Sequence, residues 1–254
     1  MRFQVLGCSG GSIPGRRPTS FLLNSTVAID GGALTSALSP DAQELVDHVV
    51  LSHAHLDHCA NLPFLLDNRF ARQTRPITFY GSKETIDDLR DCIFNNRIWP
   101  DFTTLRNRKS VALTLETIVP GVPFEINGLR FTPYEMEHTV PCLGYLIEDD
   151  NSKIFVSGDT GSAHSVRRMV EQVEGLSAVV IEISWPNRLD ALARASGHLI
   201  PSHLEQAWPL HPEARILITH IKPLHYEEIV SELTGLGCAN LVILEDGMEF
   251  EFRG

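Results

Sequence analysis

Short apolar runs alternate with helical patterns along the whole chain. Several of the runs are rich in Val and Ile, which is typical of buried β-strands. The runs that predict strands are Phe3–Leu6, Ser20–Leu23, Thr26–Ile29, His48–Leu51, Ile77–Tyr80, Leu129–Tyr134, Leu143–Glu148, Lys153–Val156, Ala178–Ile183, Arg215–Thr219 and Leu241–Leu244.

Helical patterns lie between these runs. They predict helices over Leu56–Asp67, Lys83–Phe94, Ala163–Val173, Ser202–Trp208 and Tyr226–Leu233. Ser82 and Ser162 each precede one of these helices and are expected to be N-caps, because a serine oxygen can accept from the free backbone N–H groups of a first turn. The segment 95–111 is the least regular part of the chain, and we interpret it as a lid or an insertion.

Strands occur on both sides of the middle of the sequence, with helices between them. This order predicts an α/β fold in which two sheets pack together and helices cover their outer faces. No linker rich in Pro, Gly or Ser separates two halves, so we expect one domain over residues 1–254. A domain of this length buries about three-quarters of the surface of its unfolded chain, so the core needs no disulfides.

The charge balance restricts the partners of the protein. The formal net charge is -11, from 21 Lys and Arg residues and 32 Asp and Glu residues. Because contacts to nucleic-acid phosphates need clustered Lys and Arg, this balance argues against an extended nucleic acid as partner. The one dense basic cluster, Leu105–Lys109, is interpreted as a solvated loop.

The cysteines and the apolar runs indicate the cellular compartment of the protein. The five cysteines are odd in number and widely spaced, at Cys8, Cys59, Cys92, Cys142 and Cys238. This usage predicts reduced thiols rather than a disulfide framework. The chain starts with a strand pattern instead of a signal peptide, and no apolar stretch approaches the roughly 20 residues that cross a bilayer. We therefore predict a cytoplasmic protein with no membrane partner.

A dense set of potential metal ligands follows the strand pattern that ends at Leu51. The run is His53-Ala54-His55-Leu56-Asp57-His58. Imidazole nitrogen and carboxylate oxygen are standard ligands for zinc and similar divalent ions. His53 and His55 are expected to point the same way from a loop, while Asp57 and His58 begin the next helix. The alternative is a chance cluster of histidines on a solvated turn.

Three further residues extend this set. His138, Asp159 and His220 each follow a predicted strand, as the first run does. Because loops at one edge of a sheet converge, these side chains are expected to lie close to the first run. A lone histidine more often fills a surface or a core, so each of the three depends on the others.

The sequence resembles the metallo-β-lactamase superfamily, whose signature is His-x-His-x-Asp-His. More narrowly, it resembles the class II cyclic nucleotide phosphodiesterases. The resemblance rests on Leu6-Gly7-Cys8-Ser9-Gly10-Gly11, Asp30-Gly31-Gly32, the run 53–58, Ser157-Gly158-Asp159-Thr160, Ser196-Gly197-His198-Leu199 and Thr219-His220-Ile221-Lys222-Pro223. It departs from the phosphodiesterase pattern at Asn61, where a glycine is expected, and at Leu66-Asp67, where Ser-Pro is expected.

The resemblance implies a four-layer αββα sandwich and a site for two divalent ions, with Zn²⁺ expected first and Mn²⁺ or Fe²⁺ as alternatives. One ion would be held by His53, His55 and His138. The other would be held by Asp57, His58 and His220, and Asp159 would bridge the two. Such a pair of ions lowers the pKa of a shared water and clamps an in-line phosphoryl displacement.

The resemblance also implies an acid for the leaving group. His198 is expected to protonate the departing alkoxide, and Glu182 is expected to orient its imidazole. We count Asp57, His198 and Glu182 as the catalytic residues, so Asp57 has two roles. A structural glutamate and a surface histidine are the alternative.

These features together predict a dinuclear metal-dependent hydrolase. The expected reaction opens a 3′,5′-cyclic nucleotide (cAMP or cGMP) to the 5′-monophosphate by attack of a metal-bound hydroxide. The substrate is thus a small anionic phosphodiester, and a homodimer is one option for the assembly. The alternatives are a ribonuclease Z-like tRNA 3′-processing enzyme, which should carry a long basic arm, a lactonase or thioesterase, and a non-catalytic metal-binding scaffold.

Overall fold

The computed structural model describes residues 1–207 and 213–253. Within these ranges, fourteen strands form two sheets of seven strands each. The first sheet has the order β14-β1-β2-β3-β4-β5-β6, and its strands are β1 (Arg2–Gly7), β2 (Ser20–Leu23), β3 (Val27–Ile29), β4 (His48–Val50), β5 (Ile77–Gly81), β6 (Leu113–Thr117) and β14 (Glu249–Glu251). From β3 to β6, neighbouring strands are parallel.

The second sheet repeats this plan with the later strands. Its order is β13-β12-β11-β10-β9-β8-β7, and its strands are β7 (Phe124–Ile126), β8 (Leu129–Met136), β9 (Cys142–Glu148), β10 (Lys153–Val156), β11 (Ala178–Glu182), β12 (Arg215–Thr219) and β13 (Leu241–Ile243). From β10 to β13, neighbouring strands are parallel. Each sheet therefore has one edge at which several strands end together.

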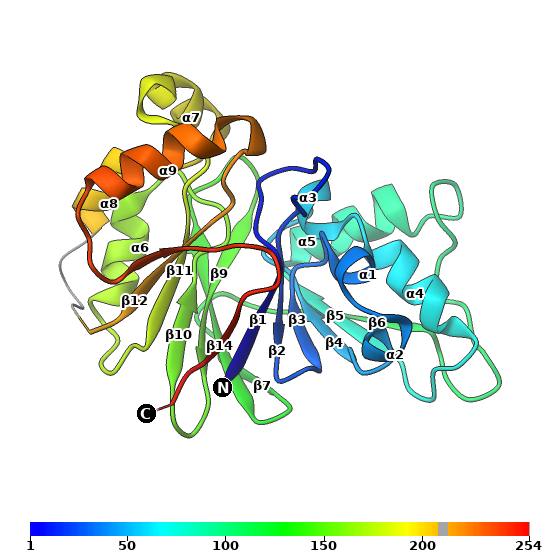
Figure 1. Ribbon diagram of the computed structural model, residues 1–254. Coiled ribbons are helices and arrows are strands. Elements are labelled where there is room, and N and C mark those ends of the chain that lie inside the picture. Colours follow the sequence, from blue (N-terminus) through cyan, green and yellow to red (C-terminus); the bar gives the residue numbers. More distant parts are fainter. Residues whose placement is uncertain (208–212, 254) are drawn as a thin grey trace.

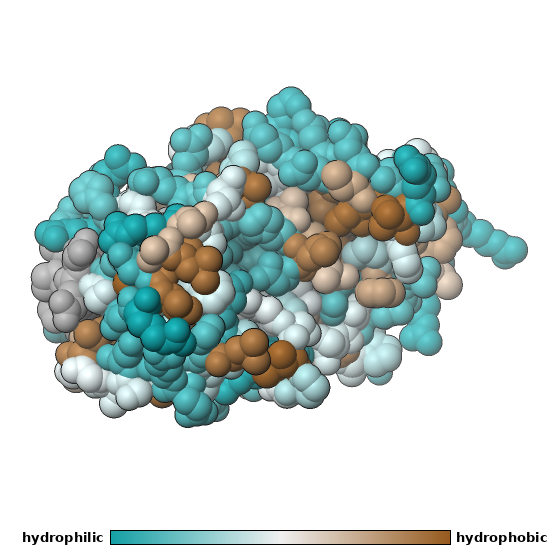
Figure 2. All heavy atoms as spheres, turned by 90° about the horizontal axis from the view of Figure 1, so that it is seen from above, coloured by the Kyte–Doolittle hydropathy of each residue, from teal (hydrophilic) through white to brown (hydrophobic). Residues whose placement is uncertain are grey.

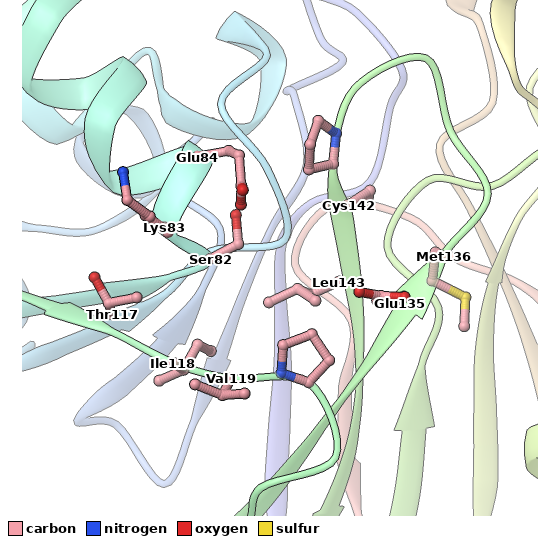
Figure 3. Close-up of a pocket in the computed structure, with 12 residues that line it drawn as sticks. Ser82, Lys83, Glu84, Thr117, Ile118, Val119, Glu135, Met136, Cys142 and Leu143 are labelled. Carbon is pink, nitrogen blue, oxygen red and sulfur yellow. The ribbon is translucent and has the colours of Figure 1, made fainter.

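Helices cover the outer faces of both sheets (Figure 1). Those beside the first sheet are α1 (Leu34–Ala37), α2 (Pro40–Gln43), α4 (Leu62–Phe70), α5 (Lys83–Asp88) and the π-helical turn Leu89–Ile93. Those beside the second sheet are α6 (Ala163–Val170), α7 (Asp190–Ser196), α8 (Pro201–Ala207) and α9 (Tyr226–Gly235). The short helix α3 (Leu56–Cys59) lies above the strands of the first sheet in Figure 1, and 3-10 turns occur at Asn187–Leu189 and Pro223–His225.

Three apolar clusters among the described residues hold these layers together. Between the sheets, Phe3 and Phe21 of the first sheet belong to one cluster with Phe131 and Tyr145 of the second. A second cluster packs the outer face of the second sheet against α6, α8 and α9, and a third packs the first sheet against α1 and α4. The predicted four-layer αββα sandwich is thus confirmed.

Most predicted elements agree with the structure to within a few residues. Ser82 and Ser162 are both N-caps, since their Oγ atoms accept from the backbone N–H of Thr85 and Ser165 at 3.1 and 3.2 Å. The elements that the sequence did not predict are short: α1, α2, α7, β6, β7 and β14. The predicted helix Ser202–Trp208 is observed as Pro201–Ala207, and Trp208 lies outside the described residues.

Among residues 1–207 and 213–253, there is no helix with the length and apolar character that a membrane span requires. The segment 95–111 is a series of turns packed on the first sheet's helical layer: Phe102 is buried, and Trp99 stacks edge-to-face on Phe64 at 5.3 Å. Its basic cluster is only partly solvated, because the Nδ2 of Asn107 donates to the carbonyls of Phe70 and Gln73.

The prediction of one helix over Leu56–Asp67 was wrong, because Asn61 divides it into α3 and α4. The Oδ1 of Asn61 accepts hydrogen bonds from the backbone N–H and the hydroxyl of Thr35, at 3.0 and 2.9 Å, and from the N–H of Ser36 at 3.1 Å. Its own N–H donates to the carbonyl of Gly31. Asn61, the departure from the phosphodiesterase pattern, therefore joins α1 to the helices behind the His-rich run.

We predict that Asn61→Ala lowers the free energy of unfolding by about 1–2 kcal/mol, since the three donors on Thr35 and Ser36 lose a shared acceptor. Urea denaturation of the metal-free protein measures this change. Asn61→Asp keeps the acceptor oxygen and is the matched control. Equal stability of Asn61→Ala and the wild type would contradict the proposed role of this side chain.

Candidate metal centre

The seven predicted ligand residues lie on loops that leave neighbouring strand ends. His53 and His55 follow β4, and Asp57 and His58 lie in α3. His138, Asp159 and His220 follow β8, β10 and β12 of the other sheet. Hydrogen bonds join the two sheets here: the hydroxyl of Tyr145 donates to the carbonyl of Leu51, and the N–H of Leu143 donates to that of Ser52. The site therefore lies where the edges of the two sheets meet.

Asp159 is the centre of the set. Its Oδ2 lies 3.3 Å from His220 Nε2, 3.4 Å from His58 Nε2, 3.7 Å from His53 Nε2 and 4.0 Å from His138 Nε2. The Asp159 carboxylate is 2% exposed. One buried carboxylate oxygen thus faces four imidazoles from both sheets, which is the position expected for a bridging ligand.

The donor atoms divide into the groups that the sequence predicted. His53, His55, His138 and Asp159 form one group, and Asp57, His58 and His220 form another, with all ligand atoms of a group within 4.8 Å of one another. His58 Nε2 and His220 Nε2 are 3.2 Å apart, and His55 Nδ1 and His138 Nε2 are 3.3 Å apart. Two ligands of a tetrahedral zinc ion are separated by about 3.3 Å, so these spacings suit a divalent ion.

A third group consists of Asp159, His198 and His220. It shares two members with the predicted set and adds the residue that we interpret as an acid. The role of every residue in these groups stays a prediction, which metal analysis of variants can test.

The ring orientations fit a metal centre. His53 Nε2 is buried and has no hydrogen-bond partner among the described residues, although its Nδ1 contacts Ser52 Oγ at 2.9 Å. Three other histidines make a contact through Nδ1 at 2.8 Å. His58 contacts Asp30 Oδ2, His138 contacts the carbonyl of Gly197, and His220 contacts Ser184 Oγ. Because such contacts fix the tautomer of a ligand histidine, each Nε2 lone pair is left for an ion.

The charges also favour a bound cation. Burial lowers the pKa of His53, His55 and His138, so these rings are neutral, as metal ligands must be. For Asp159, burial opposes ionisation, but the imidazoles of His220 and His58 outweigh it and hold its pKa well below the usual value. Burial also opposes protonation of His58, yet Asp159 and Asp30 outweigh it and raise its pKa well above the usual value. The buried carboxylates therefore need a compensating positive charge.

The backbone is unusual at two of these positions. Asp30 and His220 have φ values of 57° and 63°, in the left-handed region that non-glycine residues seldom adopt. Such conformations cluster at functional sites, where the surrounding contacts hold them. A Cβ on Gly10 would lie 2.6 Å from His220 Nδ1, so the glycine-rich loop between β1 and β2 packs against this predicted ligand.

The structure brings the predicted acid and its partner into direct contact. His198 Nδ1 lies 2.8 Å from Glu182 Oε1 and 4.0 Å from Asp159 Oδ2. Glu182 is fully buried, and its carboxylate also accepts from the N–H of Thr160 and the hydroxyl of Ser184. Burial opposes protonation of His198, but Glu182 outweighs it and raises the pKa of the imidazole. A protonated His198 beside the ligand set can donate a proton.

Sequence reasoning gave no role to several residues that orient the ligands. Asp30 accepts from Ser52 and from His58, and Ser184 lies between Glu182 Oε2 and His220 Nδ1, at 2.9 and 2.8 Å. Asp30 belongs to the motif Asp30-Gly31-Gly32, but no spacing rule relates it to His58. Ser184 carries no signal in the sequence.

Two thiols and two arginines outside the predicted set are also placed by the structure. Cys59 and Cys142 are buried free thiols, and Cys142 Sγ lies 3.7 Å from His53 Nδ1. Arg16 and Arg17 both have partners within the chain. Arg16 stacks on the ring of Tyr226, and Arg17 Nε donates to the carbonyl of Leu6.

The surface around the site is hollowed and mixed in character. A hollow of about 260 Å³ is lined by His138 and Gly197 of the site and by Arg194. A larger hollow of about 520 Å³ lies between α5, the end of β6 and the hairpin of β8 and β9; Cys142 lines it, but none of the predicted ligands does (Figure 3). Figure 2, which views the upper end of Figure 1, shows hydrophobic patches on the side of the first sheet's helices.

Comparisons with known proteins agree with this geometry. The family model described as beta-lactamase superfamily domain matches residues 21–221. The chain belongs to the metallo-β-lactamase superfamily. An uncharacterised protein of Mycobacterium leprae is 30% identical over 91% of this chain and 82% of its own length.

Some relatives carry the name of an activity. A probable 3′,5′-cyclic-nucleotide phosphodiesterase of Yersinia pestis is 27% identical over 71% of this chain and 58% of its own length. Ribonuclease BN of Escherichia coli is 30% identical over 69% of this chain and 70% of its own length. The predicted superfamily is confirmed, and the protein is a hydrolase of that superfamily.

Solved structures share the fold. Bacillus subtilis YhfI, a metallo-beta-lactamase fold protein, has a TM-score of 0.79 at 18% identity, with 98% of this chain and 99% of that chain covered. Unliganded yeast PDE1 has a TM-score of 0.78 at 19% identity and the same coverage. At these identities, the likeness concerns the fold alone.

We predict that the metal-replete protein binds about two divalent ions per chain, because seven ligands exceed the four that one tetrahedral ion takes. Elemental analysis measures the ratio in the wild type and in His53→Ala and Asp159→Ala, both of which should lose metal and activity together. His164→Ala, which changes an exposed histidine on α6, is the control. One ion or fewer in the wild type would contradict the two-ion site.

Proposed function

We propose that the protein is a dinuclear metal-dependent phosphodiesterase that hydrolyses 3′,5′-cyclic nucleotides to 5′-monophosphates. The observation that carries this proposal is the contact of His198 with Glu182 beside the ligand set. A hydrolase that releases a good leaving group needs no such acid. A hydrolase that releases a ribose alkoxide does need one, because the alkoxide is a poor leaving group until it is protonated. The cyclic-nucleotide phosphodiesterases among the relatives support the same substrate class.

The chain's own residues would hold the ions and orient the acid. His53, His55 and His138 would bind one ion, Asp57, His58 and His220 the other, and Asp159 both. When bound, two divalent ions act as Lewis acids on the phosphate and lower the pKa of a bound water. We expect Zn²⁺, with Mn²⁺ or Fe²⁺ as alternatives. Since the ligand set contains only two carboxylates, Asp57 and Asp159, the loaded site keeps positive charge for an anionic diester.

Glu182 connects the acid to one ligand. Ser184 has one hydroxyl hydrogen, so when it donates to Glu182 it accepts from the Nδ1–H of His220. Glu182 likewise accepts the Nδ1–H of His198, which leaves the Nε2–H of a protonated His198 for the 3′ oxygen. In this arrangement, the proton moves from His198 Nε2 to the departing oxygen as the phosphorus–oxygen bond breaks.

A ribonuclease Z-like activity is the second candidate, because ribonucleases are also among the relatives. It would use the same Asp159, Glu182 and His198. The net charge of -11 disfavours it, since tRNA binding depends on many phosphate contacts. A small cyclic diester needs no such surface, so we propose a small-molecule substrate. We also propose a cytoplasmic setting, with a homodimer as one option for the assembly.

We predict that His198→Ala loses about 10²–10⁴-fold in kcat on cyclic AMP or cyclic GMP, the range of general acid catalysis. It should lose far less on bis(p-nitrophenyl) phosphate, because p-nitrophenolate leaves readily as an anion. Rates on both substrates and bound metal are measured on the same protein sample.

Glu182→Gln should show a milder form of the same pattern, since Glu182 only orients the imidazole and stabilises its charge. An equal loss on both substrates would show that His198 is not the acid. A fall in metal content together with activity would make His198 a ligand instead.

We also predict weak or no binding of tRNA at physiological salt. The formal charge of -11 repels an extended polyanion, and the exposed basic residues of 105–109 form one short loop. A filter-binding titration with pre-tRNA, with 3′ processing followed in parallel, tests this. Tight binding with efficient processing would replace the phosphodiesterase proposal by the second candidate.

A further inference from the structure

Lys222 places a cation beside the ligand set. It lies two residues after His220, at the start of the 3-10 turn Pro223–His225. Its backbone N–H donates to the carbonyl of Ser184 at 3.2 Å, and its carbonyl accepts from the N–H of His225 at 2.9 Å. Both backbone groups are therefore held, and the side chain starts from a fixed position next to a predicted ligand.

The ammonium group lies between a ligand and an aromatic ring. Lys222 Nζ is 4.0 Å from Asp57 Oδ2 and 6.0 Å from the centroid of the Trp185 ring. Trp185 is itself held, because its Nε1 donates to Ser196 Oγ at 3.1 Å. The Lys222 side chain is 23% exposed. It is therefore confined by its neighbours, yet a ligand at the site can reach it.

Asp57 cannot be a full partner for this cation once an ion is bound. Asp57 Oδ2, the oxygen nearest to Lys222, is also 3.3 Å from His220 Nε2 and belongs to the second ligand group. A carboxylate that coordinates a divalent ion shares its charge with that ion. Over the described ranges 1–207 and 213–253, no other carboxylate lies within ion-pair distance of Lys222 Nζ. The ammonium is then available to an anion from outside.

Nearby arginines are already engaged. Arg17 pairs with Asp246, and Arg16 lies 3.3 Å above the ring of Tyr226. Arg194, beside His138, pairs with Asp190 one helical turn away. Lys222 differs from them, since its nearest partner is a predicted metal ligand.

We propose that Lys222 binds a non-bridging oxygen of the substrate phosphate and thereby selects an anionic substrate. The ammonium donates a charge-assisted hydrogen bond to that oxygen, on the side of the site where Asp57 lies. This role rests on the proposed function insofar as the substrate is a phosphodiester. The charge of Lys222 supplements the positive charge of the ions. Because salt screens this charge, substrate affinity should fall as the salt concentration rises.

The test compares Lys222→Met, which removes the charge at similar length, with Lys222→Arg, which keeps it. Lys153→Met is the matched control, because Lys153 pairs with Glu148 within the second sheet. In metal-replete protein, calorimetry measures the Kd of inorganic phosphate, and steady-state kinetics measure kcat and KM for bis(p-nitrophenyl) phosphate. Elemental analysis measures metal in each variant.

We expect Lys222→Met to raise the phosphate Kd and the KM about 10-fold, with a smaller change in kcat and unchanged metal content. Lys222→Arg should restore most of the affinity and also the salt dependence that Lys222→Met loses, and Lys153→Met should match the wild type. Unchanged phosphate affinity in Lys222→Met overturns the proposal. So does a loss of metal in that variant, because Lys222 would then act through Asp57.

The outcomes separate this proposal from the proposed function. If the wild type hydrolyses neither cyclic AMP nor cyclic GMP, yet Lys222→Met loses phosphate affinity, the phosphodiesterase proposal fails and the role of Lys222 stands. If cyclic nucleotides are hydrolysed and Lys222→Met binds phosphate like the wild type, the reverse holds.

Discussion

The Asp159 carboxylate, buried among imidazoles from both sheets, is the interaction on which the site depends. A carboxylate that is 2% exposed is costly unless positive charge compensates it. In the protein alone, that charge comes from protonation of rings such as His58, whose pKa Asp159 and Asp30 raise against the opposing effect of burial. Divalent ions can take over the same task. The need for positive charge around Asp159 thus links metal binding to the packing of the two sheets, since the imidazoles around it come from both.

The sandwich architecture makes this concentration of ligands feasible. Each sheet ends its parallel strands at one edge, and hydrogen bonds from Tyr145 and Leu143 attach the loop after β4 to the opposite sheet. The left-handed backbone at Asp30 and His220 then directs two side chains that regular structure could not direct. Apolar clusters pack against both faces of each sheet and hold the strands that carry these loops.

The residues that hydrogen-bond to the histidines determine which ring nitrogen faces the site. Asp30, Ser184 and the Gly197 carbonyl each hold the Nδ1 of one histidine, so that the Nε2 atoms face one another. Glu182 does the same for His198 and, against the opposing effect of burial, raises the pKa of that ring. The proposed role of Lys222 follows the same logic, since a cation beside a ligand carboxylate becomes available when that carboxylate binds an ion.

The order of most strands, the packing of two sheets and the residues of the candidate metal centre could all be predicted before the fold was known. Alternating apolar runs mark strands, and the spacing from His53 to His58 is a chemical signature that needs no coordinates. The sequence did not reveal the break at Asn61, since that break depends on Thr35 and Ser36, far away in the chain. Nor did it reveal the short edge strands or the partners Asp30 and Ser184. These features follow from the three-dimensional arrangement, because hydrogen-bond partners and ring orientations arise where separate strand ends meet, and no residue spacing encodes that meeting.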